Sequence, residues 1–163
     1  MSSIWKKTVN MPEFPVLAGE IETEVAVIGG GMAGLLTACL LEMRGIDCVV
    51  LEANRVGGGV TGGTTAKITS QHGLCYHKLL EEVGFERAEE YAKRNEEAIE
   101  AYAQIIENQE IDCDFRRVST YLYASEANPA LEEEYRAAEK LGLSADMVTQ
   151  TELPLPLWGA LRF

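Results

Sequence analysis

The sequence predicts an α/β fold that begins with a parallel βαβ unit, and three observations support it. An apolar, β-branched run over residues 24–29 ends in glycine, as expected for a strand buried on both faces of a parallel sheet. Apolar residues then recur at helical spacing over 32–44, and Gly45 is a natural helix C-cap. A second apolar run over 47–52 completes strand, helix and strand, within the ~30 residues typical of a βαβ unit.

The sequence of the remaining residues predicts a long loop, followed by both helices and strands. The predicted elements are, in order, a loop over 53–73, helices over 76–83 and 86–109, a strand within 114–125, a helix over 129–141, and short strands over 145–149 and 158–163. Asn128 as N-cap, with Pro129 at the first helical position, predicts where the last helix begins, and Gly142 predicts its end. A loop as long as 53–73 in a compact domain is usually functional.

A glycine motif lies between the first predicted strand and its helix. Residues 29–34, Gly-Gly-Gly-Met-Ala-Gly, fit the pattern G-x-G-x-x-G. Gly29 allows the tight turn, Gly31 lets the backbone approach a pyrophosphate, and Gly34 lets helix and strand pack closely. The N–H groups at the start of the helix, at the positive end of its dipole, bind phosphate charge. The motif therefore predicts a dinucleotide-binding turn in a Rossmann-like domain.

The residues after the second strand favour FAD over other dinucleotides. Glu52 ends that strand 18 residues after Gly34, where a carboxylate accepts hydrogen bonds from ribose hydroxyls and disfavours the 2′-phosphate of NADP. A second glycine-rich loop over 57–63, followed by Thr64-Thr65-Ala66, can place amides and hydroxyls along a long ligand beyond its adenosine half. A nicotinamide domain more often turns promptly into its next helix, so an NAD-binding dehydrogenase domain is the alternative.

Residues 24–52 together with 56–73 resemble the FAD-dependent amino acid and amine oxidoreductases of the D-amino acid oxidase/glycine oxidase superfamily. The run Thr61-Gly-Gly-Thr-Thr-Ala-Lys-Ile-Thr-Ser-Gln-His-Gly73 is similar to the subgroup that carries a C-terminal Rieske iron–sulfur domain, as are 111–115 and 158–163. The Thr-Thr-Ala-Lys part is the specific one, because many flavoproteins share the glycine motif. The likeness covers nearly the whole chain from residue 22 onward.

This resemblance implies an incomplete Rossmann-like FAD-binding domain and the start of a substrate domain built on an antiparallel sheet. We expect an N-terminal lead-in over 1–22, the N-terminal part of the FAD domain over 23–110, and the truncated beginning of the substrate domain over 111–163. The implied reaction oxidises a C–N bond of a small amine or amino acid by hydride transfer to the flavin.

The resemblance also implies which residues bind FAD. They are Gly29, Gly31, Met32, Ala33, Gly34, Glu52, Ala53, Arg55, Thr61, Thr64, Thr65 and Ala66. Some relatives attach FAD through a histidine in the second loop, where this chain has Thr61-Gly62-Gly63-Thr64, so no covalent link is expected there. No catalytic residue is assigned, and no metal ligand is predicted.

Three other side chains carry both a structural and a functional interpretation. Lys67 either stabilises reduced flavin, caps a helix or pairs with a carboxylate. His72 is favoured as a structural hydrogen-bonding residue over a proton carrier. Arg162 would meet a substrate carboxylate in the complete protein.

Composition restricts the partners and the compartment. The chain has 26 acidic and 14 basic side chains and a net charge of -12, which argues against nucleic acid and against anionic membrane surfaces as partners. No apolar run approaches the roughly 18 residues of a membrane span, and the N-terminus shows no secretory signal. Four widely spaced cysteines without a C-x-x-C pair fit a reducing compartment. These features favour the cytoplasm.

The predicted sheet is too small for its class. The 163 residues supply only two confident parallel strands, whereas a doubly wound sheet needs more strands to bury both faces. We therefore expect the N-terminal part of a longer FAD-dependent enzyme, and the enzyme prediction applies to that parent protein. The alternatives are a partner chain or self-association that completes the sheet, and a non-catalytic, truncated FAD-binding module.

Overall fold

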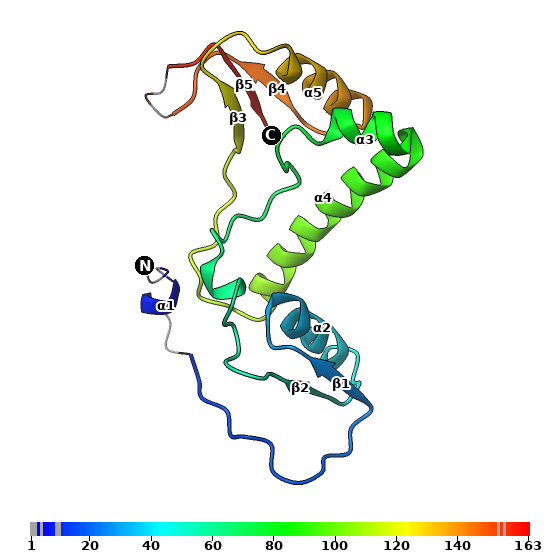
Figure 1. The fold of residues 1–163 in the computed structure, drawn as a ribbon, viewed down its shortest axis with the longest axis vertical. Coiled ribbons are helices and arrows are strands. Elements are labelled where there is room, and N and C mark those ends of the chain that lie inside the picture. Colours follow the sequence, from blue (N-terminus) through cyan, green and yellow to red (C-terminus); the bar gives the residue numbers. More distant parts are fainter. Residues whose placement is uncertain (1–2, 4, 9–10, 153, 155) are drawn as a thin grey trace. The chain divides into compact units, whose positions relative to one another are not determined.

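A computed structural model describes residues 3, 5–8, 11–152, 154 and 156–163. The chain forms two compact units, Met1–Lys67 and Ile68–Phe163, which are described separately below. The first contains a parallel sheet and the second an antiparallel sheet, each accompanied by helices (Figure 1). The predicted α/β class, with an antiparallel sheet after the βαβ unit, is confirmed.

The first unit is built on the predicted βαβ unit. Strand β1 (Val25–Ile28) leads into helix α2 (Met32–Glu42) and then strand β2 (Cys48–Leu51), and β1 and β2 pair in parallel (Figure 1). The unit also holds the short helix α1 (Trp5–Thr8) and the 3₁₀ turn η1 (Thr61–Gly63), which contact each other. The glycine-rich loop predicted over 53–73 is therefore irregular except for this one turn.

Helix α2 ends where its glycine predicts. Gly45 has a φ of +72°, a conformation in which a side chain is strained. Its N–H donates to the carbonyl of Glu42, and the N–H of Ile46 donates to that of Leu41. This pair of bonds is the Schellman motif, which satisfies the last carbonyls of a helix.

Strand β1 departs from the prediction that both of its faces are buried. Its residues alternate between half-buried and exposed, and 78% of the Ile28 surface is exposed. Burial on both faces requires further strands and helices, and within the described residues this sheet has β2 and α2 alone. The apolar character of β1 was predicted correctly, but its burial in this chain was not.

The second unit contains three helices and a three-stranded antiparallel sheet. The helices are α3 (Tyr76–Val83), α4 (Phe85–Asn108) and α5 (Pro129–Lys140), and the strands are β3 (Tyr121–Ala124), β4 (Asp146–Val148) and β5 (Gly159–Arg162). The spatial order of the strands is β3-β5-β4 (Figure 1). Asn128 caps α5, its side chain accepting the N–H of Ala130, and Gly142 ends the helix with a φ of +74°, as predicted.

The hydrophobic core of the chain lies in this second unit. Tyr76 is fully buried in it, its ring edge-on to Tyr91 and its hydroxyl donating to the carbonyl of Ser70 at 2.5 Å. The buried cluster around Tyr76 consists of Ala88, Ala92, Ala137 and Leu141. Burial raises the pKa of the Tyr76 phenol well above its ordinary range, so this hydroxyl remains a hydrogen-bond donor.

A buried carboxylate joins α5 to α3. Glu134 is fully buried and accepts the backbone N–H groups of Cys75, Tyr76 and His77 at 3.0, 2.9 and 2.9 Å. These donors lie at the start of α3, where a helix has no internal acceptors for them. Glu134 therefore satisfies the free amides at the start of α3 and holds α5 against it.

The compact units divide after Lys67, so helices α3 and α4 group with the antiparallel sheet by packing. The predicted boundary at 110/111 separates functional domains and stays a prediction. Across the part of the chain that is described, none of the helices is both long enough and apolar enough to cross a membrane.

Candidate cofactor site

The first glycine turn is tightly packed, which explains its composition. Gly29 has a φ of +103°, in the region that glycine alone adopts freely. A Cβ on Gly34 would overlap the carbonyl oxygen of Gly29, so α2 can start this close to β1 only with glycine there. A Cβ on Gly30 would lie 3.0 Å from Cβ of Glu52 and 3.2 Å from Val56. The close packing predicted from Gly34 is present, and Gly30 adds a contact that the motif does not require.

Glu52 braces the two loops at the carboxyl end of the sheet. Its Oε2 accepts the N–H of Gly30 at 2.8 Å, and its Oε1 accepts the N–H of Asn54 at 2.8 Å. These backbone hydrogen bonds, that of Asn54 first and that of Gly30 next, hold the pKa of Glu52 below its ordinary value. A carboxylate has about four lone-pair sites, so Glu52 keeps acceptor capacity for ribose hydroxyls.

Two more hydrogen bonds join the glycine turn to the second loop. The N–H of Met32, the first residue of α2, donates to Oγ1 of Thr61 at 3.0 Å. The N–H of Gly57 donates to the carbonyl of Gly30 at 2.8 Å. The start of α2 therefore lies directly beside Thr61, whose hydroxyl accepts from Met32 and keeps its own proton to donate to an anionic group.

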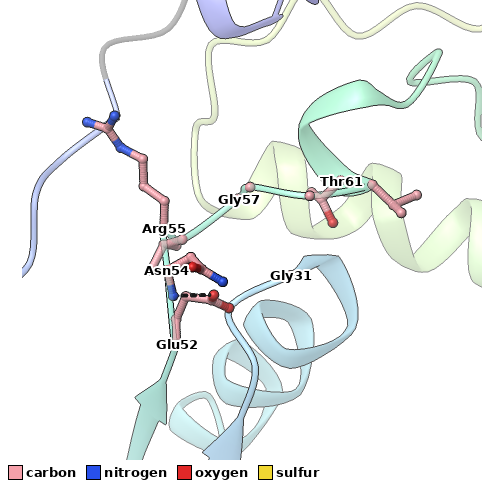
Figure 2. Close-up of a pocket in the computed structure, with 10 residues that line it drawn as sticks. Gly31, Glu52, Asn54, Arg55, Gly57 and Thr61 are labelled. Carbon is pink, nitrogen blue, oxygen red and sulfur yellow. Dashed lines mark hydrogen bonds between the residues drawn. The ribbon is translucent and has the colours of Figure 1, made fainter.

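These loops enclose a cavity of about 650 Å³ (Figure 2). Of the predicted cofactor residues, those that line it are Gly31, Glu52, Arg55 and Thr61. Those that do not line it are Gly29, Met32, Ala33, Gly34, Ala53, Thr64, Thr65 and Ala66. Of the remaining lining residues, Gly57, Gly58, Gly59 and Val60 belong to the second glycine-rich loop that the sequence predicts along the ligand. The other two, Asn54 and Val56, were not predicted.

The loop after the cavity has an unusual backbone. Ala66 has a φ of +56°, which costs energy for a residue with a side chain, and such strain is concentrated at functional sites. Its N–H donates to Oγ1 of Thr64 at 3.2 Å, which helps to hold this conformation.

Arg55 directs its charge away from the cavity. Figure 2 shows the side chain running from the loop toward the N-terminal segment, away from Gly31 and Thr61. Its Nη2 lies 3.0 Å from Oε1 of Glu13. The backbone of Arg55 lies at the cavity, whereas its guanidinium pairs outside it.

Two of the weighed side chains have structural partners in the second unit. Nδ1 of His72 lies 3.0 Å from the hydroxyl of Tyr91, which fits the structural interpretation of this histidine. Arg162 on β5 pairs with Asp146, its register neighbour on β4, at 2.5 Å.

The cavity has the donors and the size that the adenosine diphosphate half of a dinucleotide needs. Its volume falls within the usual range for ligand sites, which is about 300–1,000 Å³. Its lining includes the amide of Gly31 and the Thr61 hydroxyl, which can donate to a diphosphate, and the Glu52 carboxylate, which can accept from a ribose. Side chains on Gly30 or Gly31 would approach Glu52 or Thr61, so the cavity depends on these glycines.

The chain is similar to a known family and to several known proteins. A family model described as "DAO: FAD dependent oxidoreductase" matches residues 24–162. The chain is 37% identical over 155 residues to a Bacillus subtilis protein named, provisionally, as the Rieske 2Fe-2S iron-sulfur protein YhfW, covering 94% of this chain and 30% of that protein. It is 30% identical over 130 residues to the gamma-glutamylputrescine oxidoreductase of Escherichia coli, covering 79% of this chain and 30% of that protein.

The matched region is thus a minor part of these relatives. This chain spans 30% of the length of each of them.

Proposed function

The chain belongs to the family of FAD dependent oxidoreductases, and from that membership we propose that it forms the part of such an enzyme that holds the adenosine diphosphate half of FAD. The family assignment confirms the resemblance drawn from the glycine motif and the Thr-Thr-Ala-Lys run. Because the family is FAD dependent, it also disfavours the alternative of an NAD-binding dehydrogenase domain.

The joining of two loops around one cavity supports this proposal most directly. Glu52 braces the glycine turn against the second loop, and Thr61 lies at the first amide of α2. In the proposed complex, Glu52 accepts hydrogen bonds from the ribose hydroxyls. The amide of Gly31 and the hydroxyl of Thr61 donate to the diphosphate, while the amide of Met32 holds the Thr61 hydroxyl in place. Ala53, Thr64, Thr65 and Ala66 then contact more distant parts of the cofactor.

For the whole enzyme, we propose oxidation of a C–N bond in a small amine or amino acid. When FAD is bound, its flavin supplies the hydride acceptor, and the protein supplies binding, orientation and electrostatics. The name of the relative from Escherichia coli gives a putrescine derivative as its substrate. This supports an amine as the substrate class. The residues of this chain contribute cofactor binding, and we assign none of them a catalytic role.

The exposed apolar face of β1 fits a chain that is part of a larger enzyme. Ala26 and Ile28 leave an apolar face that a larger sheet would cover, and the relatives are about three times as long as the matched region. We propose that other residues of the same enzyme cover this face, rather than a partner chain. We further propose that the enzyme acts in the cytoplasm.

A visible absorption spectrum tests the proposal. The purified protein is mixed with FAD, desalted and scanned between about 350 and 500 nm, the region of flavin absorption. We expect retained flavin bands, and no retention of NAD in a parallel experiment. A protein that is folded by circular dichroism and retains no flavin would overturn the proposal that this chain holds the cofactor by itself.

A further inference from the structure

We propose that Arg55 is the anchor of an N-terminal strap, defined as residues Met11–Glu13, and that this strap positions the cofactor loop from outside. The inference rests on the proposed function only in taking the cavity as a dinucleotide site. It gives Arg55 a positioning role in place of the direct cofactor contact that the sequence predicts. It also gives a function to the lead-in, to which the sequence assigns none.

The first contact of the strap is an ion pair across 42 residues of sequence. Glu13 Oε1 accepts from Nη2 of Arg55 at 3.0 Å. Both side chains are largely exposed, at 86% for Glu13 and 66% for Arg55. Exposed pairs of this kind contribute little to global stability, so we expect the effect of this pair to be local to the loop.

The second contact is apolar and lies two residues further along the loop. A Cβ on Gly57 would lie 2.9 Å from Cε of Met11, so the Met11 methyl group occupies the space that a side chain there would fill. Gly57 is also the residue whose N–H donates to the carbonyl of Gly30. The strap therefore packs on the residue that joins the second loop to the glycine turn.

The direction of the Arg55 side chain favours a contact with the strap over a direct contact with the cofactor. The guanidinium points away from Gly31 and Thr61 (Figure 2), which are the groups that face an anion at the start of α2. A diphosphate can be held there by backbone amides and a hydroxyl without a cationic side chain. Since Glu13 neutralises the charge of Arg55, we assign Arg55 to the strap.

This arrangement couples the strap to cofactor binding. Residues 55–57 form one side of the cavity and carry both strap contacts. A docked strap restricts the loop to the conformation that lines the cavity, and a bound cofactor restricts the same residues. Each event therefore lowers the entropic cost of the other, and the coupling is reciprocal.

Hydrogen exchange tests the strap without any cofactor. In the intact protein, Glu13→Gln and Arg55→Gln should each speed exchange of the amides of residues 55–58 by about two- to fivefold. Glu20→Gln, which removes another exposed carboxylate of the lead-in, is the matched control and should leave exchange there unchanged. Unchanged exchange at 55–58 in Glu13→Gln would overturn the proposal.

Binding of FAD tests the role of Arg55. We expect each single variant to raise the Kd for FAD by about two- to fivefold, and the double variant to raise it no further, because both remove one contact. The charge swap Glu13→Arg/Arg55→Glu should restore binding and slow exchange. If Arg55 contacts the diphosphate instead, the swap binds more weakly than Arg55→Gln, which overturns the proposal. If the unmodified protein retains no FAD, the proposed function fails, whereas the exchange result still decides the strap.

Discussion

The backbone N–H of Gly30 donates to Oε2 of Glu52 at 2.8 Å and joins the turn after β1 to the end of β2. The other oxygen of the same carboxylate accepts the N–H of Asn54 at 2.8 Å. A residue expected to bind a ribose therefore also determines the shape of the site. Changes at Glu52 should affect the loops as well as the ligand.

We predict that Glu52→Gln weakens FAD binding by at least about tenfold, because one charge-assisted backbone hydrogen bond is lost. The amide NH₂ of Gln then faces a backbone donor instead of accepting from it. Fluorescence titration with FAD measures the effect, and Glu22→Gln, on an exposed residue of the lead-in, is the control. An unchanged Kd in Glu52→Gln would show that the brace is unimportant for binding.

The contribution of Glu52 to stability should depend on pH. Its pKa is lowered in the folded chain from the ordinary value of 4.5, so the folded state favours the ionised form. The stabilisation is therefore fully present above pH 4.5 and is lost as pH falls through the lowered pKa. Urea unfolding of the unmodified protein and of Glu52→Gln should give a stability difference that shrinks below that pH. A difference that grows on acidification would contradict the assignment.

Gly34→Ala should disrupt the first unit. The added Cβ would overlap the carbonyl oxygen of Gly29, which is backbone and cannot move aside alone. We expect a loss of about 3 kcal/mol or more in the free energy of unfolding and loss of FAD retention. Gly63→Ala is the matched control, since a Cβ there meets no atom within 4 Å. Urea unfolding of both variants makes the comparison, and equal stabilities would refute the packing argument.

Glu134→Ala should be among the most destabilising single changes in the second unit. It leaves three N–H groups at the start of α3 without their acceptor, at an expected cost of about 3–5 kcal/mol. Glu133→Ala removes the neighbouring, exposed carboxylate and should cost roughly 0.5 kcal/mol or less. Chemical unfolding followed by circular dichroism distinguishes the two, and similar midpoints would contradict the role of Glu134.

FAD should be released when the protein is denatured. The second loop has Thr61-Gly62-Gly63-Thr64, which contains no side chain that commonly forms a covalent flavin bond. Acid precipitation of flavin-loaded protein should leave the flavin in the supernatant. Yellow pellet protein, with flavin mapped by mass spectrometry to a peptide covering 61–64, would refute this prediction.

The sequence predicts the elements well because their limits depend on neighbouring residues. Gly45 and Gly142 end helices through local backbone geometry, and Asn128 begins one through a bond to a residue two positions away. The glycines of the cofactor turn are likewise identified by spacing alone. For this reason the sequence points to the loops that line the cavity, and the residues that bind the cofactor stay a prediction.

Contacts between distant residues could not be predicted in the same way. Glu134 accepts from Tyr76 across 58 residues of sequence, and Arg55 pairs with Glu13 across 42. The chain has many exposed acidic residues, so the sequence does not show which glutamates make such contacts. The prediction that both faces of β1 are buried was wrong for a related reason. The apolar residues of β1 are typical of a strand inside a larger sheet. Ile28 is exposed because burial depends on which other elements surround the strand.

The sparse burial of the first unit has a consequence for the stability of this chain. Among the residues of that unit whose burial the structure describes, Gly30 and Gly62 are the buried ones, so its folded state gains little from an apolar core of its own. A ligand that binds only the folded state then supplies much of its stability by mass action. We expect the unfolding midpoint of this chain to rise with the concentration of FAD, by an amount that follows the ratio of free FAD to its Kd.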